Sequence, residues 1–313
     1  MTDLQKKLQK RWGRKFIDER DWSRYNEELV KRGEYLLAFD FVENWDNELM
    51  EMNSHKQGAP FKFPKTMIEL QSIWHAKQIS FRMIEGMTRD LVKLGGLPTF
   101  NDYSTVNRRV NQLDFCLALP RGDAITVFSD GTGLQAINGG EYLREKYGKK
   151  NRRWIQIVML GDAEHHEPVS YEINLIQESE SKSTKSQIKT LHAKNIKLNS
   201  FGGDGAFDDK ELWDFLDQKN IKSLIKPDKN AIENSNCWSR NVAVKKRNKL
   251  GHKKWSREIG YGHRWPSTEG IFSAIKRIFS EQLAATSEQG MLHEAACKIW
   301  AYQKIKRYGE STA

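Results

Sequence analysis

The second half of the chain, from Pro120 onward, alternates between apolar and amphipathic runs in an order that few folds can accommodate. Apolar runs of strand length come first, and runs with helical spacing then separate further strands. The predicted elements are strands over 124–130, 153–162 and 168–176, a helix over 183–194, a strand over 197–204, a helix over 208–219, a strand over 221–226, and a last helix from Ser267 to Leu283. This order predicts an α/β domain with a mixed sheet flanked by helices.

Three acidic residues stand where these elements begin or end. Asp130 closes the first predicted strand before Gly131, and Asp204 lies in a Gly-Asp-Gly run at the end of the fourth. Glu269 falls in the first turn of the last helix, for which Ser267 is the predicted N-cap. Taken singly, each acid also fits a turn residue or a partner of the helix dipole. Together they predict one metal site, although 73 and 64 residues separate them.

A second acidic run competes with this assignment. Asp162, His165 and His166 lie close together after the second predicted strand, and Asp162 could take the place of Asp204. Adjacent residues on a strand point to opposite faces, so few of these side chains can share one ion. We therefore prefer Asp204 and leave the Asp162 cluster as an alternative.

Positive charge gathers just before Glu269. The whole chain carries a net charge of +10. Residues 240–264 hold nine basic residues and one acidic residue, and this stretch includes Lys245, Lys246 and Arg247. Trp238, Trp255, Tyr261 and Trp265 between them offer flat rings for base stacking. A basic segment of this kind favours contact with nucleic-acid phosphates, and a solvated basic loop remains the alternative.

The first half of the chain is predicted to be helical throughout. A charged, tryptophan-rich segment covers residues 1–62, and helices are predicted over 67–76, 81–94 and 103–113. The third helix turns Val106 and Val110 inward and presents Asn107, Arg108 and Arg109 outward. Such a helix after a turn is typical of a helix-turn-helix that enters a DNA major groove, although any three-helix bundle has a polar face.

Other classes of protein are disfavoured. Three widely spaced cysteines form no Cys-x-x-Cys pair, which argues against a disulfide framework or a zinc site. No apolar run approaches the roughly 18 residues of a membrane span, so we expect no membrane partner. A reduced cytoplasm is the expected compartment.

Asp130, Asp204 and Glu269, with Tyr261, Arg264 and Lys276 around the last, resemble the DDE transposases of insertion sequences. The resemblance is to the group with a Tyr-Arg-Glu-Lys signature, and especially to insertion-sequence family five. Two residues separate Tyr261 from Arg264 and six separate Glu269 from Lys276, as in that signature. Four residues, where the signature has three, lie between Arg264 and Glu269. Segments starting at Asp21 and Asp102 also resemble the family.

The resemblance implies a ribonuclease H-like fold with a basic insertion at about 228–264. It divides the chain into an N-terminal segment (1–62), a helix-turn-helix domain (63–118) and a catalytic domain (119–313). It implies that the three acids hold two Mg²⁺ ions, with Mn²⁺ as a substitute, and that Arg264 and Lys276 hold phosphates. The partners would be the terminal inverted repeats, target DNA and a second copy of the chain, on the nucleoid.

In this interpretation the chain cleaves DNA at the ends of an insertion sequence and transfers the strands to a target. Two alternatives remain. A non-catalytic DNA-binding protein derived from a transposase would keep the helix-turn-helix and the basic surface. A structure-selective nuclease of the same fold would keep the metals and join no strands.

Overall fold

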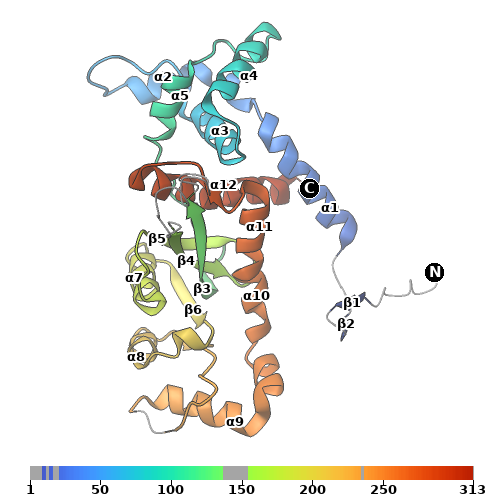
Figure 1. Cartoon of the computed structure of the whole chain (residues 1–313), viewed down its shortest axis with the longest axis vertical. Helices are drawn as coiled ribbons and strands as arrows, with labels where there is room; N and C mark the ends of the chain where they lie inside the picture. The colour runs from blue at the N-terminus through green and yellow to red at the C-terminus, as the bar shows by residue number, and fades with distance from the viewer. Residues whose placement is uncertain (1–8, 12–13, 17–20, 137–153, 234–235, 313) are drawn as a thin grey trace, which may run out of the picture. The chain divides into compact units, whose positions relative to one another are not determined.

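The computed structural model describes residues 9–11, 14–16, 21–136, 154–233 and 236–312 (Figure 1). The rest of the charged N-terminal segment and the first residue of the strand predicted over 153–162 lie outside these ranges. The chain divides into two compact units, residues 1–39 with 304–313, and residues 40–303. Every helix in the described ranges is too short or too polar to cross a lipid bilayer.

The smaller unit is built on one close approach between helices. Gly309, near the end of the last helix, lies against the helix that starts after Asp21, and a Cβ on Gly309 would be 2.5 Å from the carbonyl oxygen of Glu28. The rings of Tyr35 and Tyr308 pack beside it, with centroids 4.9 Å apart. The elements of this unit are β1 (Gln9–Arg11), β2 (Arg14–Phe16), α1 (Trp22–Glu34), η1 (Tyr35–Leu37) and the end of α12 (Glu288–Thr312).

The larger unit contains the predicted mixed sheet. Its strands run in the order β5-β4-β3-β6-β7, and β8 pairs with the far end of β3. The first three strands of the sequence pair antiparallel, whereas β6 and β7 run parallel to β3. This is the ribonuclease H-like arrangement, so the predicted fold class is confirmed. The strands are β3 (Ala124–Ala136), β4 (Trp154–Asp162), β5 (Pro168–Asn174), β6 (Lys197–Gly202), β7 (Lys222–Ser223) and β8 (Gln282–Leu283).

Helices cover both faces of this sheet (Figure 1). On one face, Val127 and Leu160 share a buried core with α7 and α8. On the other, Phe128 and Gly161 meet the segment that leads to Glu269. Side chains on a strand alternate between faces, so this division follows from the strand sequence alone. The helices are α7 (Glu180–Ala193), α8 (Lys210–Gln218), α10 (Arg264–Ser267) and α11 (Glu269–Phe279).

The three helices predicted ahead of the sheet are present within about three residues of their expected bounds. Ser80 and Asp102 cap the second and third of them by accepting hydrogen bonds from main-chain amides. Val106 and Val110 are buried as predicted. The helical region comprises η2 (Asp40–Val42), α2 (Trp45–Asn53), α3 (Lys65–Ala76), α4 (Phe81–Lys93) and α5 (Tyr103–Val110).

Candidate active site

The register of two parallel strands sets Asp130 and Asp204 level. Phe128 of β3 pairs with Gly202 of β6. Asp130 comes two residues after Phe128, and Asp204 comes two residues after Gly202. The Asp130 carboxylate accepts a hydrogen bond from the amide of Gly131 at 2.9 Å. Asp204 caps the short helix η3 (Gly205–Phe207) by accepting from the Ala206 amide at 2.9 Å. Both carboxylates therefore lie at the same edge of the sheet.

The prediction that the first strand ends on Asp130 is wrong. The strand β3 continues to Ala136, because its second half keeps β4 as a partner on one side. On the other side, the last pair with β6 is at Phe128. Asp130 thus lies in the middle of β3, just beyond the last residue that pairs with β6. The main chain of β3 has no β6 partner at this position.

Glu269 is the first residue of α11, but its helix differs from the prediction. Ser267 is buried inside the preceding short helix α10, where its hydroxyl donates to the His263 carbonyl at 2.5 Å, so it is no N-cap. The helical conformation is interrupted between α10 and α11 at Thr268, which has φ −130° and ψ −79°. Leu283, predicted on the same helix, belongs to β8. The break gives Glu269 a helix start of its own.

The main chain holds this helix start against the sheet. A Cβ built on Gly161 of β4 would lie 1.7 Å from the carbonyl oxygen of Ser267 and 3.1 Å from Ile271 Cδ1. Only a residue without a side chain permits this approach. Ile271, Ile275 and Phe279 then bury the inner face of α11, as their spacing predicts.

Arg264 connects two of the three predicted acids. Its guanidinium lies 3.3 Å from Asp130 Oδ2 and also donates to the Glu269 carboxylate. Its side chain is 18 % exposed, so the pairs are partly shielded from water. The ring of Tyr261 lies beneath the guanidinium, 6.0 Å from ring centroid to Cζ, and its edge meets Phe128. One cation therefore occupies the space between the carboxylates from β3 and α11.

Electrostatics at this site favour a positive charge. Burial raises the pKa of Asp130, and the charges of Asp204 and Glu269 raise it further, against the opposing effect of Arg264. Burial also raises the pKa of Tyr261 to about 12, so its hydroxyl stays protonated at neutral pH. Asp204 and Glu269 therefore act on Asp130 as like charges, and Arg264 acts against them.

A fourth carboxylate, which the sequence reasoning missed, is close to the same edge. Glu180 is the first residue of α7, and its Oε1 lies 2.0 Å from where a Cβ of Gly131 would be. Burial raises the pKa of Glu180, and Asp130 and Asp204 raise it further. The sequence predicts this helix only from residue 183, so Glu180 falls in the polar loop before it. An acid in the first turn of the helix after the third strand was the available signal.

The other predicted site residues lie elsewhere. Lys276 of α11 is 4.0 Å from the Glu281 carboxylate. Lys245, Lys246 and Arg247 lie on the helix α9 (Trp238–Glu258), which is kinked at Gly251. The basic segment has acidic partners within the protein: in addition to the Arg264 pairs, Arg240 pairs with Asp208 and Lys246 with Glu258, each at 2.8 Å.

Only some of the interleaved rings in this basic segment can stack on a base. Trp238 is 79 % exposed, whereas Trp255 is 1 % exposed. Trp255 is buried because it packs between His252 and Tyr261, with ring centroids 5.8 and 5.4 Å away. The prediction of Trp255 as a stacking surface is therefore wrong.

On α5, the three predicted polar residues differ in exposure. Arg108 and Asn107 are exposed, while Arg109 stacks on Phe61, 4.1 Å from Cζ to the ring centroid. Asn107 accepts a hydrogen bond from the Asn111 amide at 2.5 Å. Arg108 is thus the most accessible cation of this helix.

The Asp162 alternative is a folded turn. Asp162 is buried at the end of β4 and accepts from the Glu164 amide at 2.8 Å and from His165 Nδ1 at 3.0 Å. Across the described ranges, no three His, Cys, Asp or Glu side chains converge closely enough to hold an ion as they stand. At the predicted site, Arg264 lies between the carboxylates of Asp130 and Glu269.

Two family models match this sequence. A model described as a transposase DDE domain matches residues 121–302, more than half of the chain, and includes the whole mixed sheet. A second model with the same description matches residues 30–139. Members of this family bind DNA and use divalent metal ions. The chain belongs to the DDE transposase family, and it is an enzyme that cleaves DNA and transfers the cut strands.

Proposed function

We propose that Asp130, Asp204 and Glu269 are the catalytic acids of a transposase of an insertion sequence, from the Tyr-Arg-Glu-Lys group and family five. The observation that carries this proposal is the Arg264 bridge between Asp130 and Glu269, level with Asp204. It joins residues that are 139 positions apart in the chain. The spacing of Tyr261, Glu269 and Lys276 adds support.

The donor set fits a pair of hard divalent cations. Carboxylate oxygens are the ligands that Mg²⁺ and Mn²⁺ prefer. The raised pKa of Asp130 reflects, after burial, repulsion from Asp204 and Glu269, which a divalent ion would relieve. Two bound ions would activate the attacking oxygen and stabilise the leaving oxygen of an in-line displacement.

Arg264 has to exchange partners in this scheme. Its guanidinium pairs with the same carboxylates that would hold the ions, and it would turn to a DNA phosphate when they bind. A planar fork suits a phosphate as well as a carboxylate. Lys276 lies two turns along α11 from Glu269 and would hold a phosphate further along the strand.

The test of the catalytic assignment is Glu269→Gln in the purified chain. The amide keeps the shape and removes the charge, so strand cleavage at labelled element ends with Mg²⁺ should be lost, while gel-shift binding of the ends persists. Glu288→Gln, an exposed acid at the start of α12, is the matched control and should cleave normally. Full cleavage by Glu269→Gln would rule out the assignment.

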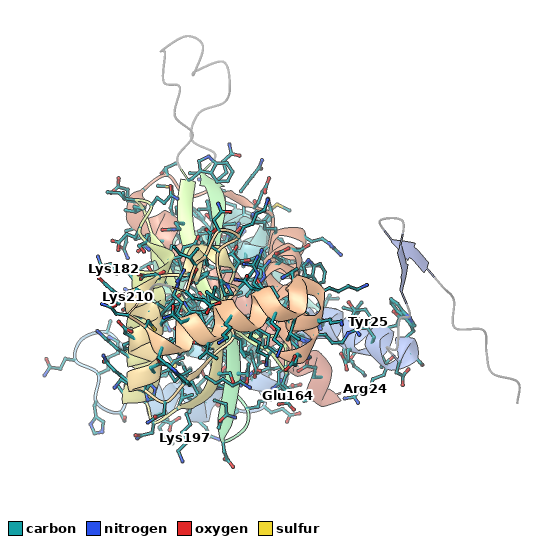
Figure 2. All side chains as sticks on the ribbon, turned by 90° about the horizontal axis from the view of Figure 1, so that it is seen from below. Arg24, Tyr25, Glu164, Lys182, Lys197 and Lys210 are labelled. Carbon is teal, nitrogen blue, oxygen red and sulfur yellow. The ribbon has the colours of Figure 1, made fainter. Side chains whose placement is uncertain are left out.

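The helix α9 would contact the DNA backbone. It crosses the near side of the larger unit in Figure 2 and carries Lys245, Lys246 and Arg247. Each duplex phosphate neutralised contributes about −0.9 to the log-log slope of affinity against salt. Changing all three to Ala should flatten that slope by up to about three units, less if the Lys246–Glu258 pair already neutralises one charge.

A matched control for this test removes the same number of charges elsewhere. Lys182, Lys197 and Lys210 project at the margin of the view in Figure 2, away from the middle of α9. Their triple replacement should leave the salt slope nearly unchanged. Equal slopes for the two triple variants would show that α9 lies off the DNA path.

The predicted helix-turn-helix would read the element ends. We propose that residues 63–118 supply this recognition, that residues 119–313 supply the chemistry, and that a homodimer pairs the two ends. Arg108→Ala should weaken cognate ends by about 1–3 kcal/mol and nonspecific DNA less. Arg109→Ala should mainly disturb its stack on Phe61. Uniform weakening on all DNA by Arg108→Ala would contradict sequence reading by α5.

A further inference from the structure

The candidate site carries one acidic side chain more than a three-acid site requires. Glu180 lies at the start of α7, on the face of β3 opposite Arg264 and Glu269. Its carboxylate rests on the main chain of Gly131, the residue after Asp130. Because Gly131 has no side chain, the Glu180 carboxylate can pack directly against the main chain of β3. The charges of Asp130 and Asp204 both raise the pKa of Glu180 beyond the effect of its burial.

The position of Glu180 is fixed by packing, not by a partner for its charge. The hydroxyls of Ser129 and Thr184 form a buried hydrogen bond of 2.8 Å that ties the first turn of α7 to β3. The same helix contacts η3, which begins after Asp204. Within the described ranges, the Glu180 carboxylate makes no hydrogen bond or ion pair. In the part of the chain that the structure describes, this half-buried carboxylate therefore feels the charges of two aspartates and has no ion-pair partner.

The helix dipole alone does not account for this arrangement. An acid in the first turn gains from the dipole wherever its carboxylate points, by about 0.3–1 kcal/mol. Placing it against Gly131 adds repulsion from the charges of Asp130 and Asp204, which an outward rotamer would reduce. A divalent ion between these carboxylates removes the conflict, because opposite charges at short range stabilise the ionised forms.

We propose that Glu180 is a fourth carboxylate of the metal site and contacts the ion held by Asp130 and Asp204, directly or through a bound water. This inference rests on the proposed metal-binding role of those two aspartates. Glu180 approaches from the α7 face and Glu269 from the α11 face, so the two glutamates enclose the strand edge from opposite sides.

The test measures Mn²⁺ binding by calorimetry on the full chain without DNA. Glu180→Gln should weaken the affinity for at least one ion about tenfold or more. Without metal, the same variant should melt at a higher temperature than wild type, because one repulsive charge is gone. Glu178→Gln is the matched control: it lies two residues earlier, pairs with Lys182 at 3.3 Å, and should bind Mn²⁺ normally.

Asp130→Asn separates this inference from the proposed function. If Asp130→Asn abolishes Mn²⁺ binding and Glu180→Gln leaves it at the wild-type level, Glu180 is not part of the site. If Asp130→Asn also binds normally, the proposed metal site itself is wrong.

A second measurement needs no variant. Fe²⁺ with ascorbate and peroxide cuts the main chain near a bound ion, and fragments should end near residues 130, 180 and 204, with protection by excess Mg²⁺. Cuts near 130 and 204 without any near 180 would overturn the proposal.

Discussion

Two aspartate–arginine pairs in the larger unit have opposite characters. Asp208 accepts from Arg240 Nε and Nη2, each at 2.8 Å, from the Trp213 indole at 3.0 Å and from the Asp228 amide at 2.9 Å. Burial by itself raises the pKa of Asp208, but these hydrogen bonds outweigh it and the pKa is lowered. Every acceptor direction of this carboxylate is used within the protein.

Asp130 and Arg264 form the other pair, at 3.3 Å. Among the residues that the structure describes, the only other donor to this carboxylate is the Gly131 amide, and the like charges of Asp204 and Glu269 act on it. Burial and these like charges raise the pKa of Asp130 despite the arginine. An ion pair surrounded by further donors keeps its carboxylate ionised, whereas one surrounded by acids retains a repulsion that an added positive charge would relieve.

Catalysis gives the largest difference between the two pairs. If Asp130 is the proposed metal ligand, Asp130→Asn should lower the rate of strand cleavage by at least about a thousandfold, because the ligand loses its charge. Asp208→Asn should cleave within a few-fold of wild type at a temperature where it is folded. Single-turnover cleavage of labelled ends checks both. A comparable loss of cleavage rate in both variants would show that the two ion pairs do not differ in their role in catalysis.

Stability should show the reverse order. Asp208→Asn leaves Arg240 without its carboxylate at a site where the Asp208 side chain is 2 % exposed, and should cost about 3 kcal/mol of unfolding free energy. Asp130→Asn in metal-free protein should change it by less than about 1 kcal/mol, because lost pairing and relieved repulsion offset each other. Urea unfolding of both variants measures this.

The stability gap between wild type and Asp208→Asn should depend on pH. Because the folded pKa of Asp208 is lowered, its ionised form contributes stability that is complete above the ordinary aspartate pKa of about 3.9. The gap should close as pH falls below that value, by at most about 1.4 kcal/mol per unit. A gap that is constant from pH 6 down to pH 2.5 would contradict the lowered pKa.

Removal of Arg264 should help a metal ion to bind. In DNA-free protein, Arg264→Ala frees two carboxylates and should tighten Mn²⁺ binding by roughly fivefold to tenfold, about 1 kcal/mol. Arg240→Ala should leave the affinity unchanged. Weaker Mn²⁺ binding by Arg264→Ala would mean that the guanidinium supports the site and does not compete for it.

The smallest effect is expected from the Tyr261 hydroxyl. Tyr261→Phe keeps the ring against Phe128 and Trp255 and below Arg264, so stability and cleavage should change by less than about 1 kcal/mol. Tyr261→Ala, which removes the ring, should cost about 3 kcal/mol of stability. A large cleavage defect in Tyr261→Phe would instead indicate a contact of the hydroxyl with DNA.

The strand order could be predicted because periodicity reports burial directly. Val127, Leu160 and Leu212 stand in patterns that only a covered sheet or an amphipathic helix explains. The ends of elements were harder to predict, since they depend on neighbours. The local sequence does not indicate that β3 continues beyond Phe128, its last residue paired with β6. It also does not indicate that the helix before Glu269 is interrupted at Thr268.

The partners of acidic side chains were also hard to predict from the sequence. Asp208 and Asp209 are adjacent acids before α8, yet Asp209 caps the helix and Asp208 binds Arg240, 32 residues later. Glu180 looks like any exposed acid until α7 is laid against Gly131. Contacts between distant segments are set by how helices pack on the sheet, which sequence patterns do not encode locally.

The close packing at Gly161, where a Cβ would lie 1.7 Å from the Ser267 carbonyl oxygen, bears on how a transposase gene can lose its activity. A copy of the gene with any other residue at this position would still carry Asp130, Asp204, Glu269 and the whole signature. Its helix start, with Glu269 at the first position, would be pushed away from the sheet. A search for the signature residues would count that copy as active, although one substitution more than 100 positions before Glu269 would have inactivated it.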